Sequence, residues 1–379
     1  MGTNSEQKID KVGILIPSAL KRDFDPKGRP VMEETRETLH AGDSWWLPGL
    51  CLMPLRWVLG WLFFSAMWRR IFLEFKLDPQ AQDYVGDKIN HFLPQALLIR
   101  PLLEMSLDHP RLLHIGLWFF TLLEGLVGIA LFLGLATRLA GLILVGLSFG
   151  ILLGAGWLGT TCLDEWQIGC LSVVSGVVLI LAGGGPFSGD AWLARRFPRL
   201  TSRRVFTLLS SGSLPLDRRS LRGLVLAASL ACLALTLWTN QVFHGGVWGP
   251  LHNKSVKPHV VMSDVAFTQD GRLAFKVSRD EGPDTYGAFI VGVELVEPSG
   301  AVVHRWDAVA LSAVPPADIR NRWLVQVKAG NYGLVLPLGG EARVRLPLPG
   351  TCKPNLPLQV TLFDVSGAHW SAPVTAAAP

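Results

Sequence analysis

The sequence predicts an α-helical membrane bundle, with a four-helix core plus a fifth transmembrane helix, followed by an all-β, sandwich-like extracytoplasmic domain. Of the 379 residues, 49% are hydrophobic and only 17% are charged. The apolar residues gather between positions 45 and 243, in blocks that are mostly long enough to cross a bilayer. From about residue 258 the pattern changes to alternating apolar and polar residues, which is typical of strands.

Five apolar blocks are the expected spans, and a helix needs about 20 residues to cross the hydrocarbon core. They are residues 54–72, 112–135, 139–158, 167–182 and 221–243. The fourth block is short and ends in Gly183-Gly184-Gly185-Pro186, which stops a helix. Glycine is dense in spans two to four, and small residues let helix backbones approach closely in lipid.

The positive charge of the chain is local and predicts its orientation in the membrane. The formal net charge is +5, but residues 190–222 alone hold eight arginines against two aspartates. Such an arm is expected on the cytoplasmic side, so the Thr137-Arg138 turn is cytoplasmic and the 159–166 turn is external. Arg69 and Arg70, at the outer end of span one, argue against this orientation. A nucleic-acid partner is not expected, because the rest of the chain carries no basic surface.

The C-terminal region carries turn signals at 270–271, 297–300, 339–340 and 366–367. Between them, runs such as 260–267, 288–296 and 358–365 suit strands, and seven or eight strands in about 120 residues predict an antiparallel sandwich. The sequence thus predicts these parts: a polar cytoplasmic extension 1–44, a membrane domain 45–190 with an external loop 74–111, an Arg-rich cytoplasmic linker 191–220, a fifth helix 221–243, and an extracytoplasmic domain 244–379. The expected location is the inner (plasma) membrane.

Glu124 lies near the middle of span two, where a carboxylate is costly unless it is neutral, paired or beside water. One interpretation is a proton relay or a partner for a polar ligand head. The alternative is a protonated side chain bonded to a neighbouring helix.

Five cysteines are too few and too scattered for a disulfide scaffold. Cys162 falls in the external turn, where its thiol is accessible, although Asp164 and Glu165 would tend to raise its pKa. Cys352 lies in the external domain. The alternatives are redox chemistry at Cys162, a structural disulfide between the two cysteines, or no pairing of them. The remaining cysteines fit small apolar positions in or near membrane helices: Cys51, Cys170 and Cys232.

Cations in the external loop are candidates for binding an anion. Arg100, together with Lys76, Lys88 or His91, is able to hold a small dianion, although solvated charge is the alternative for each. Arg56 is expected to extend to the membrane interface. No metal site is expected, because the spacings of His244, His252 and His259 fit no ligand pattern.

Three segments together resemble a known family: Gly-Trp-Leu-Gly-Thr-Thr-Cys-Leu-Asp-Glu-Trp at 156–166, Leu-Glu-Gly at 123–125 leading to Gly-Leu-Ala-Thr-Arg at 134–138, and the glycine-rich tail 183–190. They resemble DoxD, the membrane subunit of thiosulfate:quinone oxidoreductase and a relative of the DoxX-like four-helix group. The fifth span and the strand-rich region resemble DoxA, its small partner. The chain is therefore similar to a fused DoxD–DoxA protein from about residue 46 onward.

The resemblance implies oxidation of two thiosulfates to tetrathionate, with two electrons passed to a membrane quinone. Under this hypothesis Cys162 accepts sulfur, Cys352 resolves the adduct and Glu124 serves quinone protonation. The residues expected to bind thiosulfate are Arg100, Lys88, His91 and Trp166. Those expected to bind quinone are Glu124, Trp157 and Arg138. Quinone is the electron acceptor, and no tightly bound metal or flavin is expected.

Two other functions fit the same residues. A non-enzymatic DoxX-like bundle would anchor an external β-domain that binds a partner protein. A membrane oxidoreductase acting on a different thiol or sulfur donor is the other. A homo-oligomer is compatible with either.

Overall fold

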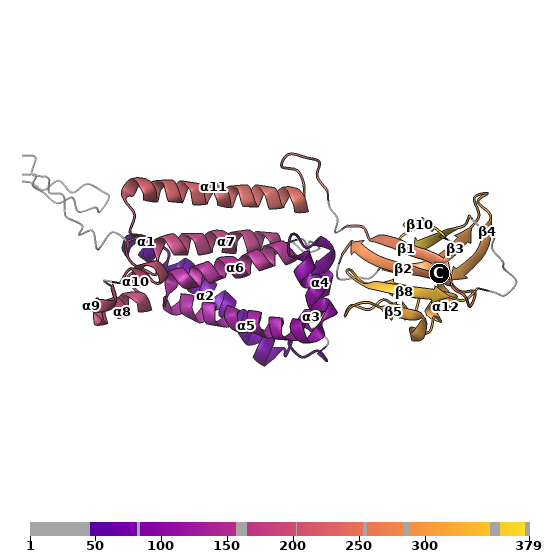
Figure 1. Cartoon of the computed structure of the whole chain (residues 1–379), viewed down its shortest axis with the longest axis horizontal. Coiled ribbons are helices and arrows are strands. Elements are labelled where there is room, and N and C mark those ends of the chain that lie inside the picture. The colour runs from indigo at the N-terminus through magenta and orange to yellow at the C-terminus, as the bar shows by residue number, and fades with distance from the viewer. Residues whose placement is uncertain are drawn as a thin grey trace, which may run out of the picture. The chain divides into compact units, whose positions relative to one another are not determined.

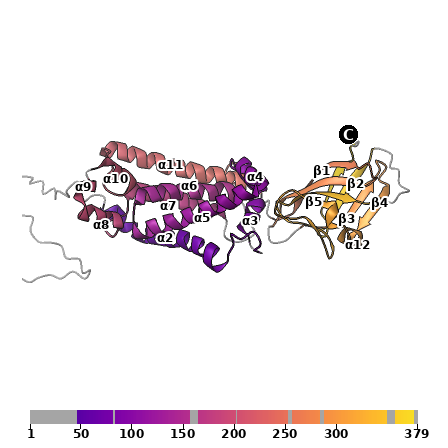
Figure 2. The same ribbon diagram turned by 60° about the horizontal axis from the view of Figure 1, so that its bottom comes forward.

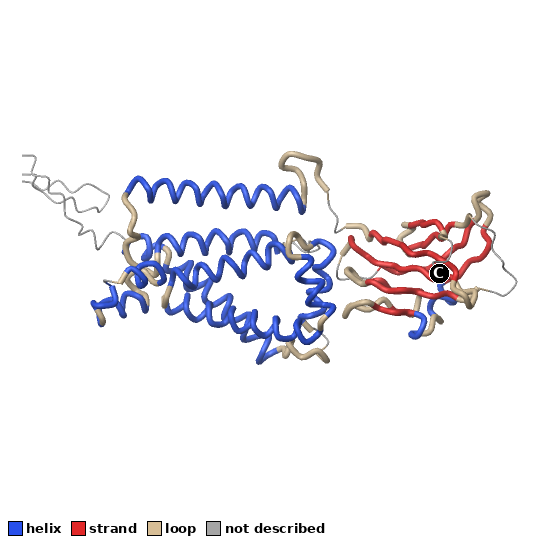
Figure 3. The backbone as a smooth tube through the Cα atoms, viewed as in Figure 1, coloured by secondary structure: helices blue, strands red, loops and turns tan. Residues whose placement is uncertain are grey.

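The computed structural model describes residues 46–379 except 82–83, 157–164, 202, 253–255, 284–287, 349–356 and 376–379. Within them, helices occupy the first part of the chain and strands the second, blue and red in Figure 3. Four helices are long and apolar enough to span a membrane, and two antiparallel sheets follow them. The predicted class, a helical membrane part followed by an all-β domain, is confirmed.

The helical part is built around α2, α5, α6 and α7 (Figure 1). Its elements are α1 Trp46–Cys51, α2 Met53–Trp68, the π-helical turn η1 Arg69–Leu73, α3 Val85–Phe92, η2 Leu93–Gln95, α4 Arg100–Asp108, α5 Pro110–Leu133, α6 Thr137–Ala155, α7 Glu165–Ala182, α8 Gly189–Arg196, α9 Pro198–Thr201, α10 Arg204–Leu209 and α11 Arg218–Phe243.

The first predicted span differs from the others in length. α2 has 16 residues and runs directly into η1, so it is not among the four helices that meet the length needed to span alone. It packs closely on α5, where an added Cβ on Gly60 would lie 2.8 Å from the Gly128 carbonyl oxygen. Two glycines facing each other let the two backbones approach as membrane helices do.

Side chains from all four central helices form one core. Leu59 of α2, Leu131 of α5, Leu144 of α6 and Leu179 of α7 are buried together. In contrast, α11 is exposed along most of its length, with only Thr239 and Phe243 buried. α11 is therefore peripheral to the four-helix core. Lipid covers the exposed apolar faces of such helices in a membrane.

The β part forms two sheets of antiparallel strands (Figure 2). One has the order β1-β2-β8-β5; the other has β10-β9-β3-β7-β6, with β4 also pairing β3. The strands are β1 His259–Phe267, β2 Leu273–Glu281, β3 Ala288–Val296, β4 Val302–Asp307, β5 Ile319–Asn321, β6 Lys328–Gly330, β7 Gly333–Leu336, β8 Glu341–Leu346, β9 Gln359–Asp364 and β10 His369–Pro373, with the short helices α12 Ala308–Ser312 and η3 Pro316–Asp318 between β4 and β5.

A single core fills the space between the sheets. Phe275 and Val344 from one sheet and Ile290 and Val360 from the other are at most 1% exposed. The described residues hold ten strands rather than the predicted seven or eight, because β5 and β6 have three residues each. Runs that short show no alternation for a sequence pattern to detect.

The loop between α2 and α5 is ordered by helices α3 and α4, and it contacts the β part. Asn90 of α3 is fully buried; its Nδ2 donates to the Gly339 carbonyl (2.8 Å) and its Oδ1 accepts from Val325 N (2.9 Å). Gly339 has φ +75°, and a Cβ there would collide with the Asn90 carbonyl. Only glycine meets both requirements, so this turn is fitted to α3. We call the contact between Asn90 and Gly339 the clasp.

Candidate functional site

Glu124 of α5 is buried at 3% exposure, and Arg70 of the π-helical turn η1 forms an ion pair with it. The same Arg70 Nη1 lies 3.4 Å from the Thr121 hydroxyl, and its guanidinium lies 5.9 Å from the centre of the Phe120 ring. Of the arrangements that the sequence allowed for Glu124, the structure has the paired one. The pair joins η1, at the end of α2, to the middle of α5.

A second ionisable side chain lies on the same face of α5. His114 precedes Thr121 by seven residues and Glu124 by ten, spacings that bring side chains to one side of a helix. Its Nδ1 is buried and has no hydrogen-bond partner among the described residues. The polar groups His114, Thr121 and Glu124 therefore form a stripe on an otherwise apolar helix.

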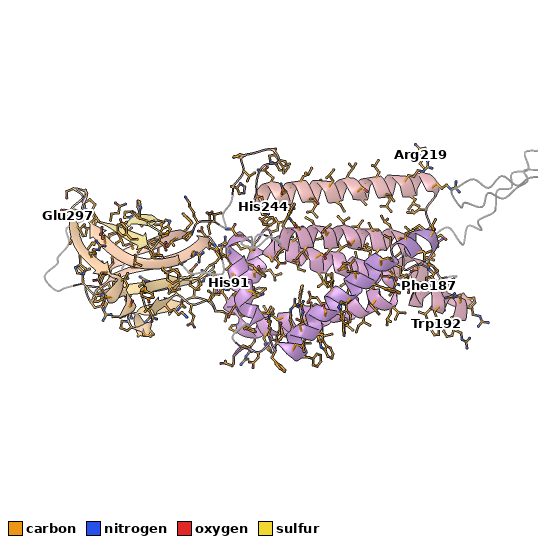
Figure 4. All side chains as sticks on the ribbon, turned by 180° about the vertical axis from the view of Figure 1, so that it is seen from behind. His91, Phe187, Trp192, Arg219, His244 and Glu297 are labelled. Atoms are coloured by element: carbon orange, nitrogen blue, oxygen red, sulfur yellow. The ribbon has the colours of Figure 1, made fainter. Side chains whose placement is uncertain are left out.

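A different polar cluster closes the opposite end of the helical part, where Figure 4 labels Phe187 and Trp192, away from His91 and His244. Its centre is Asp190 of α8, which is fully buried. Its carboxylate accepts bonds from Ala136 N (2.7 Å), Thr137 N (3.0 Å), Thr137 Oγ1 (2.8 Å) and Ser211 Oγ (2.7 Å). A carboxylate on the first N–H groups of α6 is a favourable cap, so this cluster fixes the α5–α6 turn.

Arg138 belongs to the same cluster. Its guanidinium donates to the carbonyls of Ile180 (2.9 Å), Gly212 (2.6 Å) and Thr207. These bonds satisfy the end of α7 and hold the segment after α10. The guanidinium of Arg138 is thus bonded to backbone carbonyls of three residues. The expected contact of Arg138 with quinone stays a prediction.

The expectation that Arg56 extends to the membrane interface is wrong. Arg56 is 1% exposed, and its guanidinium donates to the carbonyls of Leu131 (2.8 Å), Phe132 (3.1 Å) and Phe187 (2.8 Å). The reason is that the last carbonyls of α5 have no partner within the helix and attract a cation. Arg56 thus joins α2 to the end of α5 and to the glycine-rich tail.

Three residues predicted to take part in chemistry lie outside the described residues: Cys162, Cys352 and Trp157. Among the described cysteines, Cys51 is exposed, Cys170 is buried and Cys232 is intermediate, and all three are free thiols. The small-apolar interpretation fits Cys170, which packs with Leu152 and Phe243.

The residues predicted to bind thiosulfate have separate partners. Arg100 bonds Glu104 one turn along α4 (3.0 Å), whereas the His91 ring Nδ1 donates to the Leu338 carbonyl of the β part (2.7 Å). Lys88 is exposed on α3. Trp166 of α7 donates its indole N–H to the Thr239 hydroxyl of α11 (2.8 Å). Their joint role in binding an anion stays a prediction.

No group of three or more metal-ligating side chains occurs in the described ranges. Sequence reasoning missed Arg70 as the partner of Glu124, and it missed Asp190 as a buried carboxylate. For Arg70 the available signal was its place at the end of an apolar block, ten residues or more beyond the block's start. For Asp190 the signal was its position at the end of the glycine-rich tail.

Two family matches lie in tandem on the chain. Residues 51–217 match the family described as "TQO small subunit DoxD" and residues 243–373 match "TQO small subunit DoxA". TQO is thiosulfate:quinone oxidoreductase. A solved structure of a flagellar-like filament matches at 14% identity and a TM-score of 0.18, covering 41% of this chain and 96% of its own. A TM-score of that size carries no argument about fold or function.

Proposed function

Because the chain belongs, in tandem, to the DoxD and DoxA families of thiosulfate:quinone oxidoreductase subunits, we propose that it oxidises thiosulfate to tetrathionate and passes the electrons to membrane quinone. The tandem order of the two family segments is the observation that carries this proposal. Both subunit types in one chain would supply the membrane-embedded and the external part of one enzyme.

The proposed reaction balances as two half-reactions. Two thiosulfate dianions join through a new sulfur–sulfur bond, giving tetrathionate (S₄O₆²⁻) and two electrons. Those electrons, with two protons, convert quinone to quinol. Thiosulfate is a water-soluble dianion, whereas quinone is soluble in lipid. An enzyme that uses both substrates needs one surface in water and another in the membrane.

We propose that Cys162 and Cys352 carry the sulfur half-reaction. Starting from their disulfide, one thiosulfate attacks Cys162, forming a Cys–S–S–SO₃⁻ adduct and releasing the Cys352 thiolate. A second thiosulfate attacks the adduct and releases tetrathionate, which leaves a dithiol. Two electrons then pass from the dithiol to quinone and the disulfide reforms, with the two thiol protons leaving to solvent. The reduced ring takes up two protons, one of them through Glu124.

The Arg70–Glu124 pair supports a role in the quinone half-reaction. Arg70 offers N–H donors suited to a quinone carbonyl, Phe120 offers an aromatic face, and Glu124 is a group able to move a proton. Arg70, Phe120 and Glu124 lie where the turn η1 meets the apolar helix α5. This position suits a quinone ring that enters from the lipid. The proposed task of Glu124 is to deliver a proton to the reduced ring.

The proposed location is the inner membrane, with the β part outside. The structure brings the Arg-rich segment α8–α10 to the same end of the helices as Arg138, whose guanidinium bonds Thr207 and Gly212. Arginine-rich segments between spans favour the cytoplasmic side, which supports an extracytoplasmic β part after α11.

The test uses the full chain purified in detergent, with thiosulfate and a soluble quinone. The expected result is one quinol and one tetrathionate for every two thiosulfates consumed, followed by absorbance and by anion chromatography. Quinol formed with a persulfide donor but not with thiosulfate would assign a different sulfur substrate. No turnover with any donor, together with a stably co-purifying protein, would favour an anchor or scaffold and refute the proposal.

A further inference from the structure

Three cations lie in one row across the β1-β2-β8-β5 sheet. The pairing places Lys276 of β2 opposite Arg343 of β8, and Arg343 opposite Arg320 of β5. Arg320 and Arg343 are exposed while their neighbours Ile319 and Val344 are buried, so both arginines are on the outer face of the sheet. Residues directly opposite have Cβ atoms about 4.5–5.5 Å apart, and like charges in that position are destabilising.

The carboxylates on this face are already shared. Glu341 and Asp318 each form ion pairs with two cations. Neither carboxylate pairs with Arg320 or Arg343. These pairs are Lys276–Glu341 (2.9 Å), Arg322–Glu341 (3.1 Å), Arg272–Asp318 (2.7 Å) and Arg345–Asp318 (3.0 Å). Among the described residues no carboxylate pairs with Arg320 or Arg343, so the row keeps uncompensated positive charge.

A cavity of about 160 Å³ opens at this row. It is lined by Thr268, Arg320, Arg343 and Arg345. A water molecule occupies about 30 Å³ in the liquid, so the cavity has room for a small ion with part of its hydration shell. Three guanidinium groups around one hollow offer planar forks of N–H donors, which match oxoanion geometry.

We propose that this cavity binds a small divalent oxoanion of sulfur on the β part, as a site distinct from the Arg70–Glu124 pair of the helical part. A dianion there would neutralise the two unpaired arginines and remove the repulsion between them. Its identification as thiosulfate rests on the proposed function, whereas binding of a divalent oxoanion does not. The site would collect the anion at the external domain before it reaches the reacting thiols.

The first experiment measures thermal unfolding of the full chain with added sulfate, against sodium chloride at equal ionic strength. The wild type should gain several degrees with sulfate. R343Q should lose that gain. In anion-poor buffer it should unfold at a higher temperature than the wild type, because one of the two like charges that face each other, Arg320 and Arg343, is removed. R305Q is the matched control, since Arg305 is an exposed arginine on the other sheet, paired with Glu294. It should keep the full gain.

The second experiment titrates the same proteins with thiosulfate and with sulfate by calorimetry, without quinone. R343Q and R320Q should each weaken binding about tenfold or more, as expected for a lost charge-assisted bond, and R305Q should not. Thiosulfate bound more tightly than sulfate would identify the substrate. Equal binding of the two would support a general divalent oxoanion site.

The outcomes separate this inference from the proposed function. Wild-type protein that oxidises thiosulfate but shows no sulfate-specific stabilisation, or R343Q that binds both anions as the wild type does, overturns the site and leaves the enzyme standing. Anion binding that depends on Arg343 in a protein without quinone reductase activity supports the site and refutes the enzyme. Two variants keep the test valid if one of them fails to fold.

Discussion

Arg70 and Glu124 form an ion pair between η1, at the end of α2, and the middle of α5, with the Glu124 side chain 4% exposed. A carboxylate at that depth is costly without a partner, and the pair removes that cost by hydrogen bonding and opposite charge. The relationship also explains why an arginine follows the apolar helix α2. Because its guanidinium is used in this pair, Arg70 counts less against the orientation proposed from the Arg-rich segment.

R70Q should therefore destabilise the protein strongly. The Glu124 carboxyl would stay buried without its cation, and breaking a buried pair costs about 3–5 kcal/mol. The matched control is R69Q, because Arg69 is exposed and its side chain donates to the Ser65 carbonyl, with no carboxylate partner among the described residues. Its effect should stay within about 0.5 kcal/mol. Thermal unfolding in detergent measures both, and equal effects of the two variants would show that the pair does not stabilise the bundle.

E124Q tests the role of the pair in electron transfer. Glutamine keeps the size of the side chain but cannot deliver a proton, so quinol formation should fall about 10²-fold or more. Formation of the cysteine–thiosulfonate adduct, followed by mass spectrometry, should be unchanged. Full quinone reduction by E124Q would exclude Glu124 as the proton donor.

C162S should abolish thiosulfate-dependent quinone reduction, since serine cannot form the sulfur adduct. C51S is the control, because Cys51 is a free, exposed thiol on α1. The measurement is quinol production at saturating thiosulfate. Retained activity in C162S would refute the thiol route while leaving the family assignment intact.

The clasp can be tested by two glycine substitutions with the same backbone conformation. Gly339 has φ +75° and Gly271 has φ +74°, but a Cβ on Gly271 meets nothing within 4 Å. G271A should cost about 1 kcal/mol for the left-handed conformation, and G339A about 2 kcal/mol more because it collides with Asn90. Chemical denaturation of the full chain gives both values, and equal costs would mean that the clasp does not stabilise the protein.

Asp87 on α3 predicts a dependence of stability on pH. Burial raises its pKa above the ordinary value of 3.8, and the nearby His91 offsets part of that shift. A carboxyl with a raised folded-state pKa stabilises the protein below pH 3.8, and this contribution is lost as pH rises through the raised value. D87N should therefore gain stability relative to wild type over that interval. A constant difference between the two proteins across the interval would contradict it.

The sequence predicted four membrane-length helices and the all-β part because both depend on apolar patterning. The block 221–243, for example, corresponds to α11, Arg218–Phe243. It could not predict that Arg70 meets Glu124, since that depends on how far α2 is rotated and shifted against α5. The role of Asp190 was hidden for a similar reason: four donors from two segments, residues 136–137 and Ser211, converge on it only after folding. The family resemblance singled out the segments that contain Glu124 and Asp190, but it did not show which residues these two carboxylates contact.

The contact between Asn90 and Gly339 joins the segment that matches DoxD to the segment that matches DoxA. The two segments are therefore held together by this non-covalent contact as well as by the polypeptide chain. Cutting the polypeptide between α10 and α11, at residues 213–216, would leave each fragment with a complementary surface for the other. Co-expressed fragments should purify as a heterodimer, and N90A should weaken that association.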